Sequence, residues 1–187
     1  MKRTDEQLLF DVAKGDKAAY REIYQNYSAA IYRLVKRMIG SQSSDYDEVF
    51  QEAMLRIWKN APLFDPAKGR AKAWIYLVST RYCLNWLETK KNRGMAREVE
   101  LPDTLKDSEA FEPEESAVRN ENATSALKLL ENLPDDLKQA VSLRHLDHLS
   151  IDEIAEITQT PSGTVKSRIF YGLRKLRSFF FKENSHE

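Results

Sequence analysis

The chain has 187 residues, 42% of them hydrophobic and 31% charged, which is typical of a soluble protein with one mid-sized domain or two small ones. Lysine and arginine together number 29, as do aspartate and glutamate, so the zero net charge excludes a uniformly basic coat for nucleic acid. The single cysteine, Cys83, excludes an intramolecular disulfide and a cysteine-rich zinc site. Met1–Leu9 lacks the apolar segment of a signal peptide, and no apolar run could span a membrane, so we expect a cytoplasmic protein.

The first two predicted helices are marked by their N-caps. Thr4–Gln7 has the form of a capping box, which opens a short helix. Asp16 is the expected N-cap of a long second helix, which carries aromatic and aliphatic residues at helical spacing and ends at Gly40.

Two more helices follow in the first half of the chain. Ser44 is the expected N-cap of a third helix, which runs to about Asn60. Leu63–Gly69 is predicted to be a loop, and a fourth helix is expected from about Arg70 to Lys91. No segment alternates with a period of two, so we predict no sheet.

Residues 94–122 interrupt the helical pattern. They are acidic, contain two prolines and have few apolar residues, a composition that favours a flexible linker. We therefore predict an N-terminal domain over 1–93 and a C-terminal domain over 123–187. The expected fold class is all-α, with two small helical domains joined by a flexible acidic linker.

The C-terminal domain has the pattern of a helix-turn-helix. Ser150–Glu153 is a second capping box, Gln159–Pro161 is a turn, and a long basic helix runs from about Ser162 to Phe180. On a helical wheel, one stripe of this last helix is expected to face the core: Val165, Ile169, Leu173, Leu176 and Phe180.

The charges fall in blocks. Residues 68–97 contain eight basic residues and one acid, residues 98–122 contain nine acids and two basic residues, and residues 163–182 contain six basic residues and no acid. Two basic patches on either side of an acidic strip favour nucleic-acid binding. The alternative is that each basic patch is a solvated helix face.

The last helix presents groups that can read DNA. Ser167 and Arg174 point away from the core stripe, Lys166 and Arg168 lie on its two flanks, and Phe170 lies off it. An exposed aromatic ring can contact a thymine methyl, while cations reach phosphates or guanine edges. The alternative is an amphipathic helix whose cations merely extend to water.

Two earlier helices carry further candidate surfaces. In the third, Leu55 lies on the outer face with carboxylates and an amide, which resembles a protein-docking patch; the alternative is a solvated face with Trp58 tucked against a neighbour. In the fourth, aromatic residues lie among basic residues, which suits stacking of unpaired bases; the alternative is a central helix buried on most sides.

No group of residues indicates catalysis. His145 and His148 lack a third ligand, and Asp135 and Asp136 are better explained as charges at a helix start. We find no phosphate-binding glycine loop and no nucleophile or metalloprotease motif. We therefore expect no catalytic residue, no metal and no cofactor, and a protein that is not an enzyme.

Three stretches together resemble a known family, the extracytoplasmic-function sigma factors. Asp47–Glu52, continued by Leu55, Ile57 and Trp58, is similar to the family's polymerase-docking helix. Trp74–Val78 is similar to the start of its promoter-opening helix. Its second domain is matched by three short motifs: Leu133–Pro134, Glu153–Ala155 and Gly163–Arg168.

The resemblance implies a promoter-specific initiation factor that binds core RNA polymerase and promoter DNA. The docking residues it implies are Asp47, Gln51, Glu52, Leu55 and Trp58. Those implied at the minus-ten element are Trp74, Tyr76, Arg81 and Asn85. Those implied at the minus-thirty-five element are Lys166, Ser167, Arg168, Phe170 and Arg174. Arg81 stands where members often have an asparagine that holds a flipped base.

The resemblance also implies an anti-sigma factor as a partner, without direct membrane insertion of this chain, and a linker that threads toward the polymerase channel. A stand-alone helix-turn-helix regulator is the alternative within DNA binding, and an adaptor that binds acidic partners is the alternative outside it. Of these three interpretations, only the sigma factor accounts for both the docking patch and the acidic linker.

Overall fold

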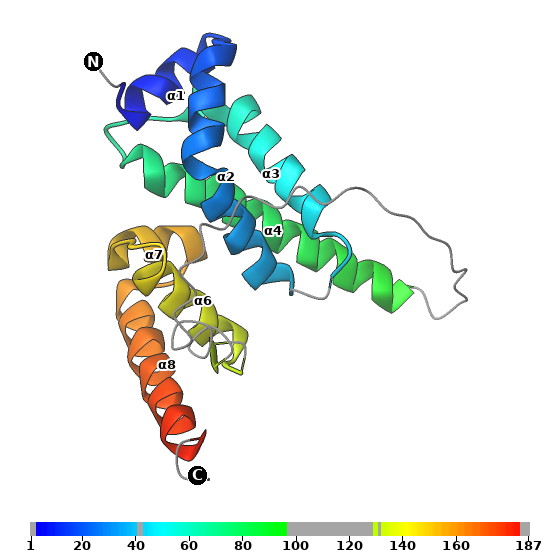
Figure 1. Cartoon of the computed structure of the whole chain (residues 1–187), viewed down its shortest axis with the longest axis vertical. Helices are drawn as coiled ribbons and strands as arrows, with labels where there is room; N and C mark the ends of the chain where they lie inside the picture. The colour runs from blue at the N-terminus through cyan, green and yellow to red at the C-terminus, as the bar shows by residue number, and fades with distance from the viewer. Residues whose placement is uncertain (1–2, 41–42, 97–128, 131, 184–187) are drawn as a thin grey trace.

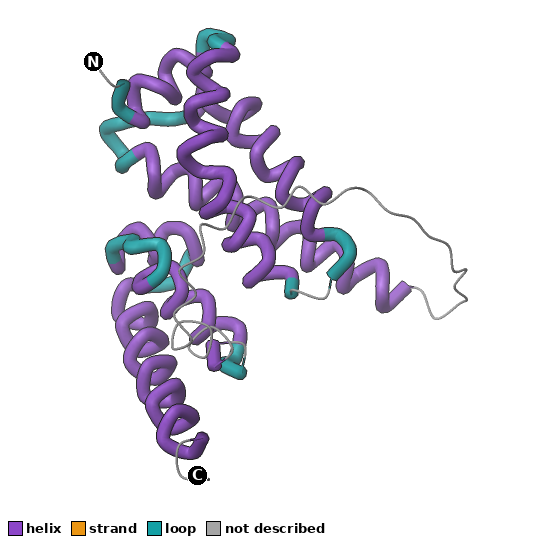
Figure 2. Tube along the Cα trace, in the orientation of Figure 1, coloured by secondary structure: helices purple, strands orange, loops and turns teal. Residues whose placement is uncertain are grey.

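The computed structural model describes residues 3–40, 43–96, 129–130 and 132–183. Within these ranges there is no strand, and the prediction of an all-α fold is confirmed (Figure 2). Figure 1 shows two groups of helices. The first comprises α1 (Asp5–Ala13), α2 (Lys17–Ile39), α3 (Tyr46–Asn60), the short 3₁₀ helix η1 (Ala61–Leu63) and α4 (Ala71–Ala96). The second comprises α6 (Asp135–His145), α7 (Ile151–Thr158) and α8 (Ser162–Glu183).

The helix starts of the first group follow the capping chemistry of the sequence. The Thr4 side chain accepts from the Gln7 amide while the Gln7 side chain accepts from the Thr4 amide, which completes the predicted capping box. Asp16 accepts from the Ala18 and Ala19 amides at 2.7 and 3.2 Å, as expected of the N-cap of α2. Gly40 ends that helix with φ of 90°, a conformation that glycine adopts without a steric penalty.

Two predicted boundaries differ from the structure. The residue that precedes α3 is Asp45 rather than Ser44, and its side chain makes no cap hydrogen bond because it pairs with Lys90 of α4 at 2.5 Å. Helix α4 continues past Lys91 to Ala96, so residues 94–96 are helical where we expected the linker to begin. A glycine inside a helix costs only about 1 kcal/mol, too little for Gly94 alone to end it. Residues 97–122 of the predicted linker lie outside the described residues.

Helix α4 is the centre of the molecule. It packs against α1, α2 and α3 on one side and against α7 of the second group on the other. The apolar side chains of Ile75, Leu77 and Cys83 are all buried along it. A helix with neighbours on more than one side needs no single apolar stripe, which explains why the buried residues of α4 are spread around it. None of the described helices is both long and apolar enough to cross a bilayer.

The second group is a helix-turn-helix with α6 behind it. Ser150 and Glu153 form the predicted capping box at the start of α7. Gln159 ends α7 in the left-handed conformation, with φ of 50°, and the chain turns there into α8.

The predicted core stripe of α8 is partly wrong. Val165 and Ile169 pack into the core as expected, but Leu173 and Phe180 are exposed. Leu176 packs against this part of the core as expected, together with Gly172 and Phe179, which the prediction did not include. From Val165 to Leu173 the predicted stripe takes two successive steps of four residues, each of which advances about 40° around the helix, so Leu173 turns away from α6. A step of three after Ile169 leads instead to Gly172, which stays on the side of Val165.

The close approach of α6 and α8 depends on Gly172. A Cβ atom at this position would lie 2.5 Å from Cγ2 of Val141, a stiff β-branched side chain. We expect Gly172→Ala to destabilise the C-terminal domain by about 1–2 kcal/mol, because the overlap costs about 1–3 kcal/mol and the better helix propensity of alanine returns about 1. Urea unfolding followed by circular dichroism measures this difference.

Gly163→Ala is the matched control, because nothing lies within 4 Å of a Cβ atom there and the same helix contains both positions. The control should be neutral or slightly stabilising. Equal unfolding midpoints for the two variants would show that α6 can move away from Gly172 without cost.

Candidate nucleic-acid and protein interfaces

The outer face of α3 carries the predicted docking patch. Leu55 is 41% exposed, Gln51 is exposed beside it, and Asp47 and Glu52 are half-buried at its edges. Glu52 pairs with Arg56 at 3.3 Å, one turn along the helix. An exposed leucine between an amide and carboxylates fits a surface that another protein covers.

Trp58 lies differently from the rest of this set. Its ring packs edge-to-face on Tyr20 of α2, with centroids 5.1 Å apart, and the Tyr20 hydroxyl donates to the backbone oxygen of Met54 at 3.0 Å. Trp58 therefore helps fix α3 on α2 and is half-buried, which corresponds to the alternative that the sequence left open.

The four residues implied at the minus-ten element divide between two faces of α4. Trp74, Arg81 and Asn85 fall within about 40° of one another at 100° per residue. Trp74 packs edge-to-face on Phe64 at 5.7 Å, while Arg81 and Asn85 are exposed. Tyr76 points to the opposite face, where it is buried and contacts the second group of helices.

A second aromatic site lies farther along α4, and sequence reasoning missed two of its cations. The guanidinium of Arg56 lies 4.6 Å from the ring centroid of Tyr82, and the ammonium of Lys90 lies 4.7 Å from that of Trp86. These residues line a pocket of about 510 Å³ between α3 and α4, with Asn85 also at its wall. The pairing of Arg56 with α4 leaves no local signal in the sequence.

Helix α8 presents most of its predicted residues to solvent. Phe170 is 61% exposed and meets Tyr171 edge-to-face, with ring centroids 5.4 Å apart. Lys166, Ser167 and Arg174 are also exposed. An apolar ring with cations on the solvent face of a helix-turn-helix suits the major groove of DNA.

Arg168 is the exception on α8. Its Nε lies 3.3 Å from a carboxylate oxygen of Asp136, and it donates to the Thr160 hydroxyl at 3.2 Å. Arg168 therefore ties α8 to α6 and to the turn, in addition to any contact with phosphate.

A polar cluster joins the two groups of helices at Asp147, which no sequence pattern indicated. Arg37 of α2 donates to its carboxylate at 2.6 Å, Tyr76 of α4 donates at 2.9 Å, and Lys72 of α4 donates to its backbone oxygen at 2.5 Å. Asp147 is 6% exposed. Nearby, Arg70 forms a two-pronged pair with Glu153 of α7 at 2.7 and 2.8 Å.

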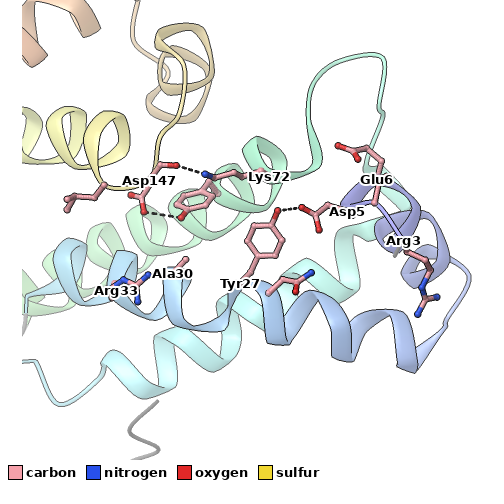
Figure 3. Close-up of a pocket in the computed structure, with 12 residues that line it drawn as sticks. Arg3, Asp5, Glu6, Tyr27, Ala30, Arg33, Lys72 and Asp147 are labelled. Carbon is pink, nitrogen blue, oxygen red and sulfur yellow. Dashed lines mark hydrogen bonds between the residues drawn. The ribbon is translucent and has the colours of Figure 1, made fainter. Parts of the chain in front are cut away.

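Burial shapes the protonation of this cluster. It raises the pKa of the Asp147 carboxyl, although Arg37 opposes the shift, and it lowers the pKa of the Arg37 guanidinium. Burial and the charge of Asp147 together raise the pKa of Tyr76, so its hydroxyl is a donor. The cluster opens on a cavity of about 730 Å³ between the groups; in Figure 3, Arg33 and Asp147 lie at one end and Arg3 and Glu6 at the other.

Within the described residues, no group of three or more histidine, cysteine, aspartate or glutamate side chains could hold a metal ion. The side chains on these surfaces can form hydrogen bonds, stack on rings and pair with charges. An all-α fold whose second group of helices is a helix-turn-helix, with rings and cations exposed on its last helix, is typical of DNA-binding proteins of the helix-turn-helix class.

Comparison with known proteins gives the family. Residues 23–93 match the model for sigma-70 region 2, and residues 124–176 match the model for sigma-70 region 4. The chain is 31% identical over 179 residues to the ECF RNA polymerase sigma-E factor of Escherichia coli K12, with 89% of each chain covered. It is 30% identical over 175 residues to the sigma-E factor of Haemophilus influenzae, with 89% of this chain and 90% of that one covered.

Two solved structures share the fold at 16% identity. CnrH in complex with the cytosolic domain of CnrY aligns with a TM-score of 0.66 over 95% of this chain and 97% of that chain. The sigma factor RpoE in complex with the anti-sigma factor NepR, from Bartonella quintana, aligns with a TM-score of 0.67 over 86% and 96%. The chain belongs to the ECF RNA polymerase sigma factor family. It is a sigma factor, which binds core RNA polymerase and directs transcription initiation at promoters.

Proposed function

We propose that three separate surfaces divide the work of initiation. The outer face of α3 around Leu55 docks on core RNA polymerase, the Trp74–Arg81–Asn85 face of α4 reads the minus-ten element, and α8 reads the minus-thirty-five element. The observation that carries the proposal is the exposed Phe170–Tyr171 pair among the cations of α8. Two adjacent exposed rings do not stabilise the folded chain by burial, and such apolar patches mark surfaces that bind a partner. The protein acts in the cytoplasm, without a cofactor and without catalysis of its own.

The proposed domains are residues 1–93 and 123–187, with residues 94–122 as the acidic linker that threads toward the polymerase channel. The matched ranges 23–93 and 124–176 support this division. An anti-sigma factor is a further proposed partner, supported by the RpoE structure, whose fold this chain shares and which was solved with NepR.

Minus-ten reading is proposed to differ from that of relatives with asparagine at the position of Arg81. Arg81 lies on the same face as Trp74 and is exposed, so its guanidinium can stack on a base or bind a guanine edge with two hydrogen bonds. Tyr76 is on the opposite face of the same helix, and in this arrangement it is not available to DNA.

Reconstituted initiation tests the reading by α8. We expect Ser167→Ala and Phe170→Ala to change the ranking of minus-thirty-five variants, by roughly 1–3 kcal/mol per lost base contact. Arg174→Ala should instead weaken binding to all promoters alike, because a phosphate contact carries no sequence information. It should also reduce the slope of log affinity against log salt by about one, because one phosphate contact is lost. Arg168→Ala should show the same uniform loss with an added loss of domain stability, since its pair with Asp136 is removed as well.

The measurement is transcript yield from core polymerase and each variant, on a panel of minus-thirty-five sequences at two salt concentrations. Retention of the wild-type ranking by both the Ser167 and the Phe170 variants would show that another surface reads the upstream element.

A further inference from the structure

The cluster around Asp147 serves the contact between domains rather than the fold of either one. Within the described residues, the Asp147 carboxylate accepts hydrogen bonds from Arg37 and Tyr76, both in the N-terminal group of helices, and from no residue of its own domain. Its nearest intradomain bond is through the backbone, from its amide to the Ser142 oxygen. The side-chain partners of this carboxylate are therefore lost when the two groups of helices separate.

The groups that hold Asp147 are those that bind phosphate. A guanidinium, an ammonium and a phenol all donate to one residue, and the same donors recognise the DNA backbone in protein–DNA complexes. Arg33 adds a fourth group, because it is exposed one turn before Arg37 on α2, and its charge also acts on Asp147. The acids at the far end of the cavity already accept hydrogen bonds. Asp5 accepts from Tyr27 (Figure 3), and Glu6 accepts from the Ala71 amide.

The cluster is incompletely satisfied. Nε of Arg37 is buried and has no hydrogen-bond partner in the part of the chain that the structure describes. An unpartnered buried N–H costs free energy, and the Asp147 carboxylate, which accepts from another nitrogen of Arg37 and from Tyr76, leaves this donor unmatched. A phosphate group offers more acceptor oxygens and a second path to that donor.

The observed arrangement cannot serve both promoter elements at once. The two elements lie about 25 base pairs apart, which is roughly 85 Å of duplex at 3.4 Å per base pair. Helix α7 contacts α4 directly, and α8, with 22 residues, is only about 33 Å long. The domains must therefore separate on a promoter, and separation frees the cations from Asp147.

We propose that Arg33, Arg37 and Lys72 form a binding site for the phosphate backbone of DNA, and that Asp147 occupies this site in the closed chain as a stand-in for phosphate. DNA binding at the site and closure of the two domains then exclude each other. The proposal deepens the proposed function, because it rests on promoter DNA as the ligand.

Domain closure can be measured directly on the full chain. Nitroxide labels on Lys68→Cys, in the exposed loop before α4, and on Ser178→Cys, on the exposed face of α8, report the distance between the domains by electron–electron resonance. Cys83 stays unlabelled in the native chain because it is fully buried and burial raises its thiol pKa to about 12. We expect one narrow distance distribution in the parent and a broader, shifted distribution after Asp147→Lys, which places a cation against Arg37 and Lys72.

DNA affinity provides the second readout. Anisotropy of a fluorescein-labelled promoter duplex should show tighter binding by Asp147→Asn, up to about tenfold if a tenth of the parent chains are open, because apparent affinity scales with the competent fraction. In that Asp147→Asn background, Arg37→Gln and Lys72→Gln should each weaken binding and lower the salt slope by about one. Asp135→Asn, a change of the same kind at an exposed site of the same domain, should change neither distance nor affinity.

Three results would overturn the proposal. One is a parent-like distance in Asp147→Lys, which would show that Asp147 does not hold the two domains together. Another is an open chain whose DNA affinity equals that of the parent, and the third is an unchanged salt slope after Arg37→Gln, either of which would deny the phosphate site. These readouts need no polymerase, so they are independent of promoter ranking by α8, and each proposal can fail while the other holds.

Discussion

Leu55→Asp should lower the affinity for core RNA polymerase by about 30-fold or more while the chain stays folded. Truncating a central anchor of an interface costs about 2 kcal/mol or more, and an aspartate adds the cost of burying an unpaired charge. The Leu55 side chain is 41% exposed, and α3 is held in place by other residues, among them the buried Ile57 and Met54. We therefore expect the stability of the fold to be nearly unchanged. Competition binding to core polymerase measures the effect.

Leu84→Asp is the control for this prediction. Leu84 is a leucine of nearly the same exposure, 40%, but it lies on α4 rather than on the proposed docking face. We expect it to bind polymerase like the parent. If both variants kept parental affinity, or lost it equally, the α3 face around Leu55 would not be the docking surface.

Leu143→Ala should unfold the C-terminal domain selectively. Leu143 lies in α6, is fully buried, and belongs to the cluster that includes Leu149 and Ile154. Truncating a buried leucine to alanine costs about 2–5 kcal/mol, which is most or all of the stability of a single core of this size. We expect loss of minus-thirty-five discrimination together with retained polymerase binding, because α3 belongs to the other group of helices.

Hydrogen exchange separates the two domains in this measurement, since amides of α7 should lose protection while those of α2 keep it. The control is Leu146→Ala at the end of the same helix, where the side chain is exposed and truncation should cost under 0.5 kcal/mol. Loss of protection in α2 as well would mean that the two domains unfold as one unit.

Both capping boxes could be predicted from the sequence because each is complete within four residues. Thr4 with Gln7 and Ser150 with Glu153 satisfy their own backbone groups, whatever surrounds them. The start of α3 shows the limit of this reasoning. Asp45 and Ser44 are equally good N-caps by residue type. The Asp45 side chain, however, pairs with Lys90, which lies far along the chain, and makes no cap hydrogen bond.

The candidate surfaces also divide into features that local helical spacing predicts and features that depend on residues far apart in the sequence. The exposure of Leu55 and Phe170 follows from helical spacing, so the sequence predicts both. Tyr76 was grouped with Trp74 because the two are near in sequence, although two residues along a helix turn about 200°. The Arg37–Asp147 pair joins residues 110 positions apart, and no periodicity within a single sequence links such positions.

The apolar contact between α4 and α7 gives the two-domain arrangement a dependence on temperature. Buried side chains of α7, such as Ile154 and Ile157, belong to one continuous cluster with the core around α4. Separating the domains exposes some of this surface to water, so the heat capacity rises on separation, and the apolar part of the attraction weakens as the solution is cooled. Chilled protein should therefore contain a larger share of separated domains than warm protein, with no change in sequence, ligand or partner.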